Sequence, residues 1–167
     1  MTASRIETLV AKLEKGGHKT HDILSGLTED RWQMVVYTGL HPWTVRDLLA
    51  HFLSAEEGLL GMVQGVAEGG PGAPEGFVLD LFNAQEQERL ADRSPQDLLD
   101  ALSVARQATI DWVRMLDEAD LDRTSRHPAL GETSLETMIM AIYGHQLLHM
   151  RDLQGLGVYS IIGRPSR

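Results

Sequence analysis

The sequence contains no cysteine among its 167 residues. The protein therefore forms no disulfide, no zinc site with thiolate ligands and no cysteine nucleophile, so any sulfur chemistry has to use an external thiol. The length fits one domain, residues 1–167, because a chain of this size buries about two-thirds of the surface that its unfolded form exposes. Such a domain needs no covalent cross-link to fold.

Long apolar runs are also absent. The first residues, MTASRIETLVAKLEKGG, have no long uncharged core and no cleavage-like site, and the longest apolar runs elsewhere fall far short of a membrane span. We therefore expect a cytoplasmic protein with no membrane partner.

Basic clusters are missing as well. The chain has 15 basic and 24 acidic residues, which gives a formal net charge of -9, and its basic residues are scattered along the sequence. A surface of this charge repels phosphate backbones. Because there is neither a basic stripe nor an aromatic platform, we expect no nucleic-acid partner.

Helical periodicity dominates what is present. Four stretches carry apolar side chains at steps of three or four residues, the spacing of one face of an α-helix. The long helices that they predict lie at residues 6–24, 44–66, 94–116 and 134–153. No segment shows the sustained two-residue alternation of a strand, so the segments between these helices are expected to be loops.

Polar residues mark three of the helix starts. Thr44 followed by Asp47 forms a plausible capped start, Ser94 stands before Pro95 at the first helical position, and Ser134 caps the last helix. These caps place the beginnings of the second, third and fourth long helices.

The connection between the second and third long helices is extended. It begins with GGPGAPEG, residues 69–76, which is a loop by composition and too short to divide domains. Residues 77–91 then predict a short helix anchored by Phe77, Leu81 and Leu90. The sequence therefore predicts an all-α fold, a four-helix bundle with a long connection carrying a short helix.

The apolar stripe of the last helix contains two histidines, within GHQLLHMRDL at residues 144–153. His145 and His149 are four residues apart, so their rings lie one above the other and can converge on one ion. With seven histidines in the chain, a pair at this spacing also arises easily by chance. Position matters more, because two imidazoles in a buried stripe each need a polar partner or a ligand.

His51 lies on the flank of the second long helix that Leu48 and Ala55 share. If that helix packs beside the last one, His51 joins His145 and His149 in a three-nitrogen site with open positions for water or substrate. The alternative is that one of these histidines is a core residue and two are boundary residues.

Three segments together resemble the DinB/YfiT-like superfamily, including its mycothiol-dependent maleylpyruvate isomerase branch. They are WTVRDLLAHF, FNAQEQERLADRSPQDLL and HPALGETSLETMIMAIYGHQLLHMRDL. The resemblance implies a metal held by one histidine after a tryptophan-led helix start and by a paired HxxxH on the last helix. These positions match His51, His145 and His149, but the resemblance does not fix the reaction.

The preferred hypothesis is a metal-dependent enzyme with three neutral imidazoles around a divalent cation, either zinc or nickel. The resemblance favours a thiol-dependent S-transferase, in which an external low-molecular-weight thiol attacks a small electrophilic molecule as its thiolate. A metal-dependent hydrolase is the alternative, and a non-catalytic helical bundle used for association is the rival from another class. The resemblance also implies a homodimer, to which Met140 and Tyr143 contribute apolar surface.

Three further residues are candidates for the surroundings of the site. Asp152, three residues beyond His149, either orients that ring or is a surface charge. His21 either rims the pocket or is exposed to solvent, and Asn83 either lines the pocket or bonds locally in a cap or loop.

Other polar residues are expected to have structural roles. Glu56 is expected to be solvated or to face a partner, and His41 and His127 precede prolines in loops, where turn geometry explains them. Trp43 is expected to seal the start of the second long helix, and Trp112 to fill the core.

Overall fold

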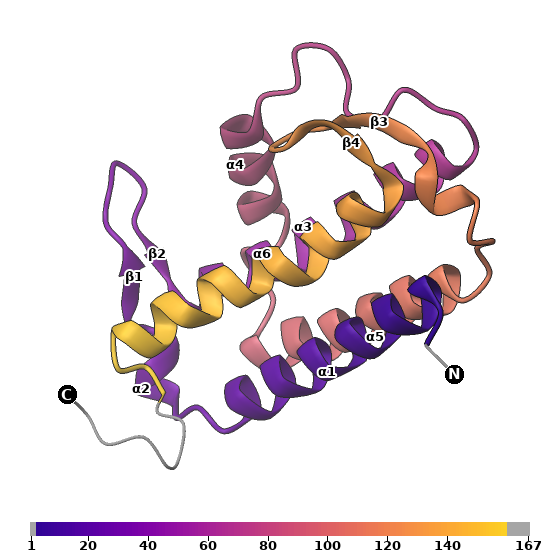
Figure 1. Cartoon of the computed structure of the whole chain (residues 1–167). Helices are drawn as coiled ribbons and strands as arrows, with labels where there is room; N and C mark the ends of the chain where they lie inside the picture. The colour runs from indigo at the N-terminus through magenta and orange to yellow at the C-terminus, as the bar shows by residue number, and fades with distance from the viewer. Residues whose placement is uncertain (1–2, 160–167) are drawn as a thin grey trace.

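Four long helices form the body of the protein. In a computed structural model, which describes residues 3–159, these are α1 (Arg5–Ser25), α3 (Val45–Ala67), α5 (Pro95–Val113) and α6 (Leu135–Gly155), shown in Figure 1. The predicted four-helix bundle is therefore confirmed. No helix within the described range has the length and apolar character needed to cross a bilayer.

The predicted caps form as expected. The Thr44 side chain accepts a hydrogen bond from the backbone N–H of Asp47, whose carboxylate accepts one from the backbone N–H of Thr44. Ser94 and Ser134 cap α5 and α6 in the same way, each accepting from a backbone N–H three residues later. Each cap satisfies donors that the first turn of a helix leaves unpaired.

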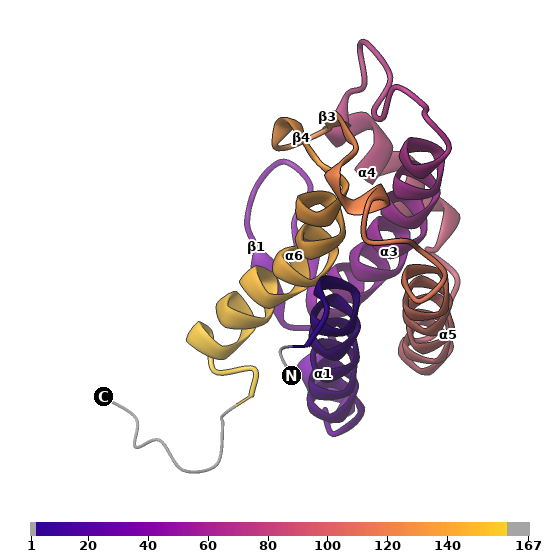
Figure 2. The ribbon, with the colours of Figure 1, turned by 45° about the vertical axis from the view of Figure 1, so that its right-hand side comes forward.

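Helix α1 continues through the glycine pair Gly16 and Gly17, and two neighbouring helices come close to it at this point. A β-carbon on Gly16 would lie 2.5 Å from the ring of Tyr143 on α6, and one on Gly17 would lie 3.0 Å from the side chain of Arg106 on α5. The glycines thus allow close packing of α1 against both helices, which lie on either side of it in Figure 2.

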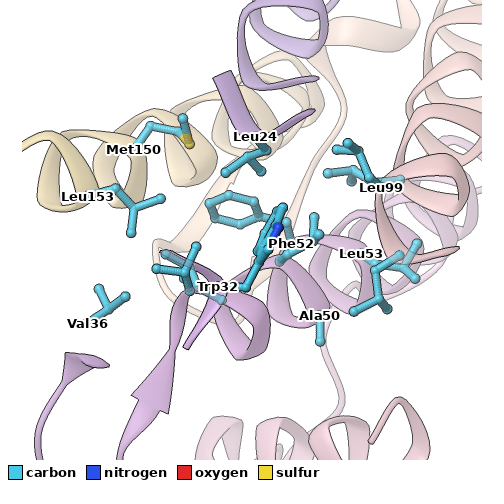
Figure 3. Close-up of a cluster of buried hydrophobic side chains, with 14 of the residues drawn as sticks. Leu24, Trp32, Val36, Ala50, Phe52, Leu53, Leu99, Met150 and Leu153 are labelled. Carbon is cyan, nitrogen blue, oxygen red and sulfur yellow. The ribbon is translucent and has the colours of Figure 1, made fainter. Parts of the chain in front are cut away.

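The core consists of two clusters of buried apolar side chains. One surrounds Phe52 of α3 and includes Leu24, Trp32, Leu99 and Leu153, as Figure 3 shows. The other lies toward the opposite end of α3 and contains residues of all four long helices: Leu13, Val63, Ile110 and Ile142 are among them. Between these clusters α3 is covered on several sides, so polar residues there are buried too.

Two hairpins and a short helix occupy segments that were expected to be loops. Strand β1 (Val35–Tyr37) pairs with β2 (Trp43–Thr44), and β3 (Thr124–His127) pairs with β4 (Gly131–Ser134), both antiparallel. The loop expectation was wrong here because strands of two to four residues are too short to show an alternating pattern. The additional elements are the helix α2 (Glu29–Trp32) and the 3₁₀ turn η1 (Asp120–Asp122).

The short connecting helix exists but is anchored differently from the prediction. Helix α4 spans Leu79–Arg89, and Phe77 and Leu81 are 38% and 57% exposed. Only Leu90, which follows the helix, is buried as expected. The helix instead contacts α3 through Phe82, which lies against Gly58, and Gln87, which donates to the carbonyl oxygen of Asp47 at 2.8 Å. A hydrogen bond from a side-chain amide to a backbone carbonyl does not depend on apolar residues, so the apolar pattern of the sequence could not predict this contact.

Candidate metal centre

Three histidine side chains from two helices meet at one point. His51 comes from α3, and His145 and His149 lie one turn apart on α6, which packs against α3. The Nε2 atom of His145 lies 2.8 Å from Nε2 of His51 and 3.2 Å from Nε2 of His149. Around one ion with metal–nitrogen distances near 2.1 Å, neighbouring nitrogens are about 3.0 to 3.4 Å apart. The distance between His145 and His149 lies in this range and the one between His51 and His145 is slightly shorter, so the geometry is compatible with three ligands of one cation.

Burial keeps these imidazoles neutral. His51 is only 7% exposed, and its burial together with the nearby His145 and His149 lowers its pKa to about 3. Burial, followed by the neighbouring His149, lowers the pKa of His145 to about 4. Burial also lowers the pKa of His149, although the carboxylate of Asp152 opposes this effect. Since a metal binds the neutral ring, the triad is in its binding form at neutral pH.

The other nitrogen of His149 is held by a residue that sequence reasoning missed. The Tyr37 hydroxyl lies 2.6 Å from Nδ1 of His149 and donates its own proton to Oδ2 of Asp152 at 2.5 Å. The tyrosine oxygen can therefore accept only from an Nδ1–H group, which leaves the Nε2 lone pair of His149 directed at the centre. Asp152 thus acts on His149 through Tyr37. No local sequence signal identifies Tyr37, because it reaches the site from a three-residue strand.

Aromatic rings enclose the triad. The ring of Trp43 is tilted over His51 with 4.9 Å between centroids, and the ring of Phe52 lies 5.9 Å from that of His149. Trp43 therefore covers the first turns of α3, as its position before the helix suggested. These rings contribute apolar surface around His51 and His149.

The remaining candidates lie in different places. Asn83 is on α4, where its Oδ1 atom is buried and has no hydrogen-bond partner among the described residues. His21 is on α1, with its side chain 44% exposed, and faces a groove between α1 and α5 that Leu102 and Arg106 also line. The structure does not bring His21 to the three histidines.

Glu56 corrects one expectation directly. It was expected to be solvated or to face a partner, but it is 1% exposed and accepts hydrogen bonds from the Arg106 guanidinium at 2.8 and 2.7 Å. The Thr109 hydroxyl also donates to it, at 2.7 Å. The expectation failed because both partners lie on α5, and helix-wheel position on α3 alone does not reveal them. Trp112, expected in the core, is only partly buried.

His127 has a role in its turn and is also buried. It ends β3 and is 6% exposed, and its Nδ1 accepts hydrogen bonds from the backbone N–H groups of Ala129 and Leu130. The turn geometry expected from the sequence therefore explains the hydrogen bonds of Nδ1, but it does not explain the burial of Nε2. Burial lowers the pKa of this histidine.

The sequence was compared with models of known families. The model described as the DinB superfamily matches residues 12–153. The chain belongs to the DinB superfamily. A comparison of this DinB-superfamily chain with curated protein sequences gives no match.

Solved structures with the same fold include two proteins with described activities. YfiT from Bacillus subtilis, a probable metal-dependent hydrolase with a four-helix bundle, has a TM-score of 0.75 at 16% identity over 90% of this chain and 85% of YfiT. The mycothiol-dependent maleylpyruvate isomerase has a TM-score of 0.70 at 17% identity over 91% of this chain. The aligned region spans only 63% of that isomerase. At these identities the likeness shows the fold.

Replacing Tyr37 by phenylalanine should weaken divalent metal binding by roughly 10-fold to 100-fold, because it removes the hydrogen-bond acceptor that holds the Nδ1–H group of His149. The dissociation constant can be measured by competition with a chromophoric chelator. Tyr143→Phe is the matched control, since Tyr143 packs against Gly16 on the side of α6 that faces α1. Equal affinity in Tyr37→Phe and wild type would contradict the role of the hydroxyl.

The metal-free protein should lose stability as the pH falls below about 6.5. The pKa of His51 is about 3 and that of His145 about 4 in the folded state, below the ordinary value, so the unfolded chain takes up protons first. Between pH 7 and pH 5 we expect the free energy of unfolding to fall by about 2 to 4 kcal/mol. Urea titrations in the presence of a chelator measure this. His51→Gln should reduce the loss, whereas equal stability at both pH values would refute the expectation.

Proposed function

We propose that this DinB-superfamily chain is a metal-dependent enzyme in which His51, His145 and His149 hold one divalent cation. The observation that carries the proposal is the convergence of one ring nitrogen from each histidine, all within 4.8 Å of one another, at a site that α3 and α6 build together. Three ligands on one side of a cation leave its other positions open for a substrate or water. An open position is typical of catalytic rather than structural metal sites.

The surrounding residues fit a bound cation. The hydrogen bond from His149 to Tyr37 fixes the tautomer that a metal requires, and the bond from Tyr37 to Asp152 holds the tyrosine in place. Imidazole nitrogen suits zinc and nickel equally, so both are proposed. When bound, the cation supplies a positive charge that stabilises a thiolate or a hydroxide at neutral pH.

Thiol-dependent S-transfer is the preferred reaction. The fold is like that of the mycothiol-dependent maleylpyruvate isomerase, and the chain has no cysteine of its own, so a thiol has to come from a small molecule. In this reaction the thiol would lose its proton to solvent, and its sulfur would form a bond to an electrophilic carbon while the bond from that carbon to a leaving group breaks. The leaving group would depart with the electron pair of the broken bond. The buried, neutral triad and the aromatic rings around it provide surroundings of low polarity for such a step.

Metal-dependent hydrolysis is the second candidate. It is supported by the fold that the chain has in common with YfiT, a probable metal-dependent hydrolase, over most of both chains. The same three histidines would serve, with water in place of the thiol.

The proposal is tested with protein purified without a histidine tag. After reconstitution with zinc or nickel, elemental analysis should find about one metal ion per chain. The loaded protein is then assayed with a panel of low-molecular-weight thiols and an electrophilic acceptor, and separately with esters and amides without thiol. Thiol-dependent product supports the transferase and thiol-independent cleavage the hydrolase. A metal-free protein after reconstitution would refute the metal centre, and a metal-bound but inactive one would favour the non-catalytic bundle.

The oligomeric state, the partners and the cellular location are proposals as well. We propose a homodimer acting on a small molecule, as a single domain in the cytoplasm, with no nucleic-acid or membrane partner. Met140 and Tyr143 are partly buried against the core and contribute to the remaining apolar surface of α6.

A further inference from the structure

His127 has a buried hydrogen-bond donor without an acceptor. Its Nδ1 accepts hydrogen bonds from the backbone N–H groups of Ala129 at 3.1 Å and Leu130 at 3.2 Å. Because both groups donate to Nδ1, the neutral ring carries its proton on Nε2. That Nε2 atom is buried and has no partner within the described part of the chain. Folded proteins rarely leave a buried N–H group unpaired, so a partner outside the chain is indicated.

The ring is held firmly in position. In the β3–β4 pairing, His127 stands opposite Gly131. The preceding residue, Arg126, is fixed to the glycine-rich loop, since its carbonyl accepts from the Ala73 N–H at 2.7 Å and its Nε donates to the Ala73 carbonyl at 2.8 Å. β3 is therefore bonded on one side to β4 and on the other to the loop at 69–76. A donor held this way is preorganised for a ligand.

The hairpin that carries this donor packs against α6, the helix that carries two of the three histidines. β3 packs against α6, and Figure 1 shows the hairpin lying over that helix. A positive charge on His127 would lower the pKa of His145, so the two rings are within electrostatic range of each other. His127 is not a fourth metal ligand, because one nitrogen is occupied by the turn and the other carries a proton.

We propose that the Nε2–H group of His127 donates a hydrogen bond to a carboxylate or carbonyl oxygen of the small molecule bound at the open side of the histidine centre. This inference rests on the proposed metal centre and assigns a substrate-contacting residue to it. It also defines a class of ligand, one that presents an oxygen acceptor toward the β3–β4 hairpin while it occupies the open metal position. A ligand without such an oxygen would leave the Nε2–H group unpaired.

Two substitutions separate the donor from the turn. An asparagine side chain places its amide oxygen where histidine has Nδ1, so His127→Asn retains an acceptor for the two turn N–H groups and has no donor at the Nε2 position. A glutamine side chain places its amide nitrogen near the Nε2 position, so His127→Gln retains the donor and gives up the turn acceptor. Together the pair shows which ring nitrogen produces an effect.

The probes are acetate and succinate, titrated into cobalt-loaded protein and followed by the visible absorption of the metal. Imidazole is the control ligand, because a neutral imidazole bound to the metal offers no oxygen acceptor. We expect His127→Asn to weaken binding of at least one carboxylate about tenfold or more, as for loss of a hydrogen bond to a charged group, with imidazole affinity unchanged. His127→Gln should remain within about threefold of wild type.

The contrary results are distinct. Unchanged affinity for both carboxylates in His127→Asn refutes the donor role while leaving the metal centre intact. An equal loss in both variants assigns the effect to the turn and also refutes it. A wild-type protein that binds no cobalt refutes the metal centre and this inference with it.

A second measurement needs no substitution. In zinc-loaded wild-type protein with ¹⁵N-labelled histidine, the His127 ring should show an Nε2–H tautomer, and its proton signal should shift downfield when the carboxylate binds. An Nδ1–H tautomer, or a signal that does not respond to saturating carboxylate, would overturn the inference.

Discussion

Replacing His149 by alanine should abolish stoichiometric metal binding and the associated activity while leaving the helical content close to that of the wild type. The substitution removes one of the three converging Nε2 atoms and also the partner of the Tyr37 hydroxyl. Because α6 retains its buried apolar residues, including Met138, Ile142 and Leu153, the helix keeps its packing against α3. Elemental analysis, activity and far-ultraviolet circular dichroism measure the three quantities.

His21→Ala is the matched control for this experiment. It removes an imidazole from α1, a long helix that carries none of the three clustered histidines. The His21 side chain is 44% exposed. This variant should bind metal and turn over substrate as the wild type does. Equal activity in His149→Ala and wild type would show that the paired histidines are not the catalytic centre.

Replacing Arg106 by methionine should lower the free energy of unfolding by about 3 to 5 kcal/mol, because it leaves the buried Glu56 carboxylate without its cation. Both side chains of the Glu56–Arg106 pair are buried, and their hydrogen bonds connect all four long helices. Arg106 also donates to the carbonyl oxygen of Leu13 on α1, and Gln146 on α6 donates to Glu56. Urea denaturation measures the loss.

Two further variants test whether the loss of stability comes from the unpaired buried carboxylate of Glu56. In Glu56→Gln/Arg106→Met the buried charge is gone and an amide can still accept from Thr109, so most of the lost stability should return. Arg114→Ala removes an exposed ion pair with Glu14 and should cost no more than about 1 kcal/mol. If Arg106→Met lowered the free energy of unfolding no more than Arg114→Ala does, the buried pair of Glu56 and Arg106 would not stabilise the bundle as expected.

The sequence identified the helices well because their signals are local. A cap such as Thr44 with Asp47 involves residues three positions apart, and an apolar stripe repeats every three or four residues. The pairing of His145 with His149 is of the same kind. Placing His51 with them required only that α3 and α6 be neighbours, which the resemblance to the DinB/YfiT-like superfamily implied and the structure confirmed.

The short elements and the polar core could not be predicted in the same way. Leu81 is apolar and sits in a helix, yet it faces solvent, because α4 attaches through Phe82 and the amide of Gln87. Glu56 looks like a surface acid until α5 supplies Arg106 and Thr109. In both cases the deciding contact is a polar or aromatic partner on another element, which periodicity does not report.

The sequence by itself determined the four long helices and the pairing of His145 with His149, since both follow from spacing along a helix. His51 joined the pair only through the resemblance to the superfamily. Only the tertiary structure decided what surrounds those imidazoles. Tyr37 meets His149 across 112 positions of sequence, and a hairpin whose strands have four residues each brings the strand that carries His127 against α6. Tautomer, burial and pKa depend on such contacts between distant segments, because the field and hydrogen bonds at a ring come from its neighbours in space.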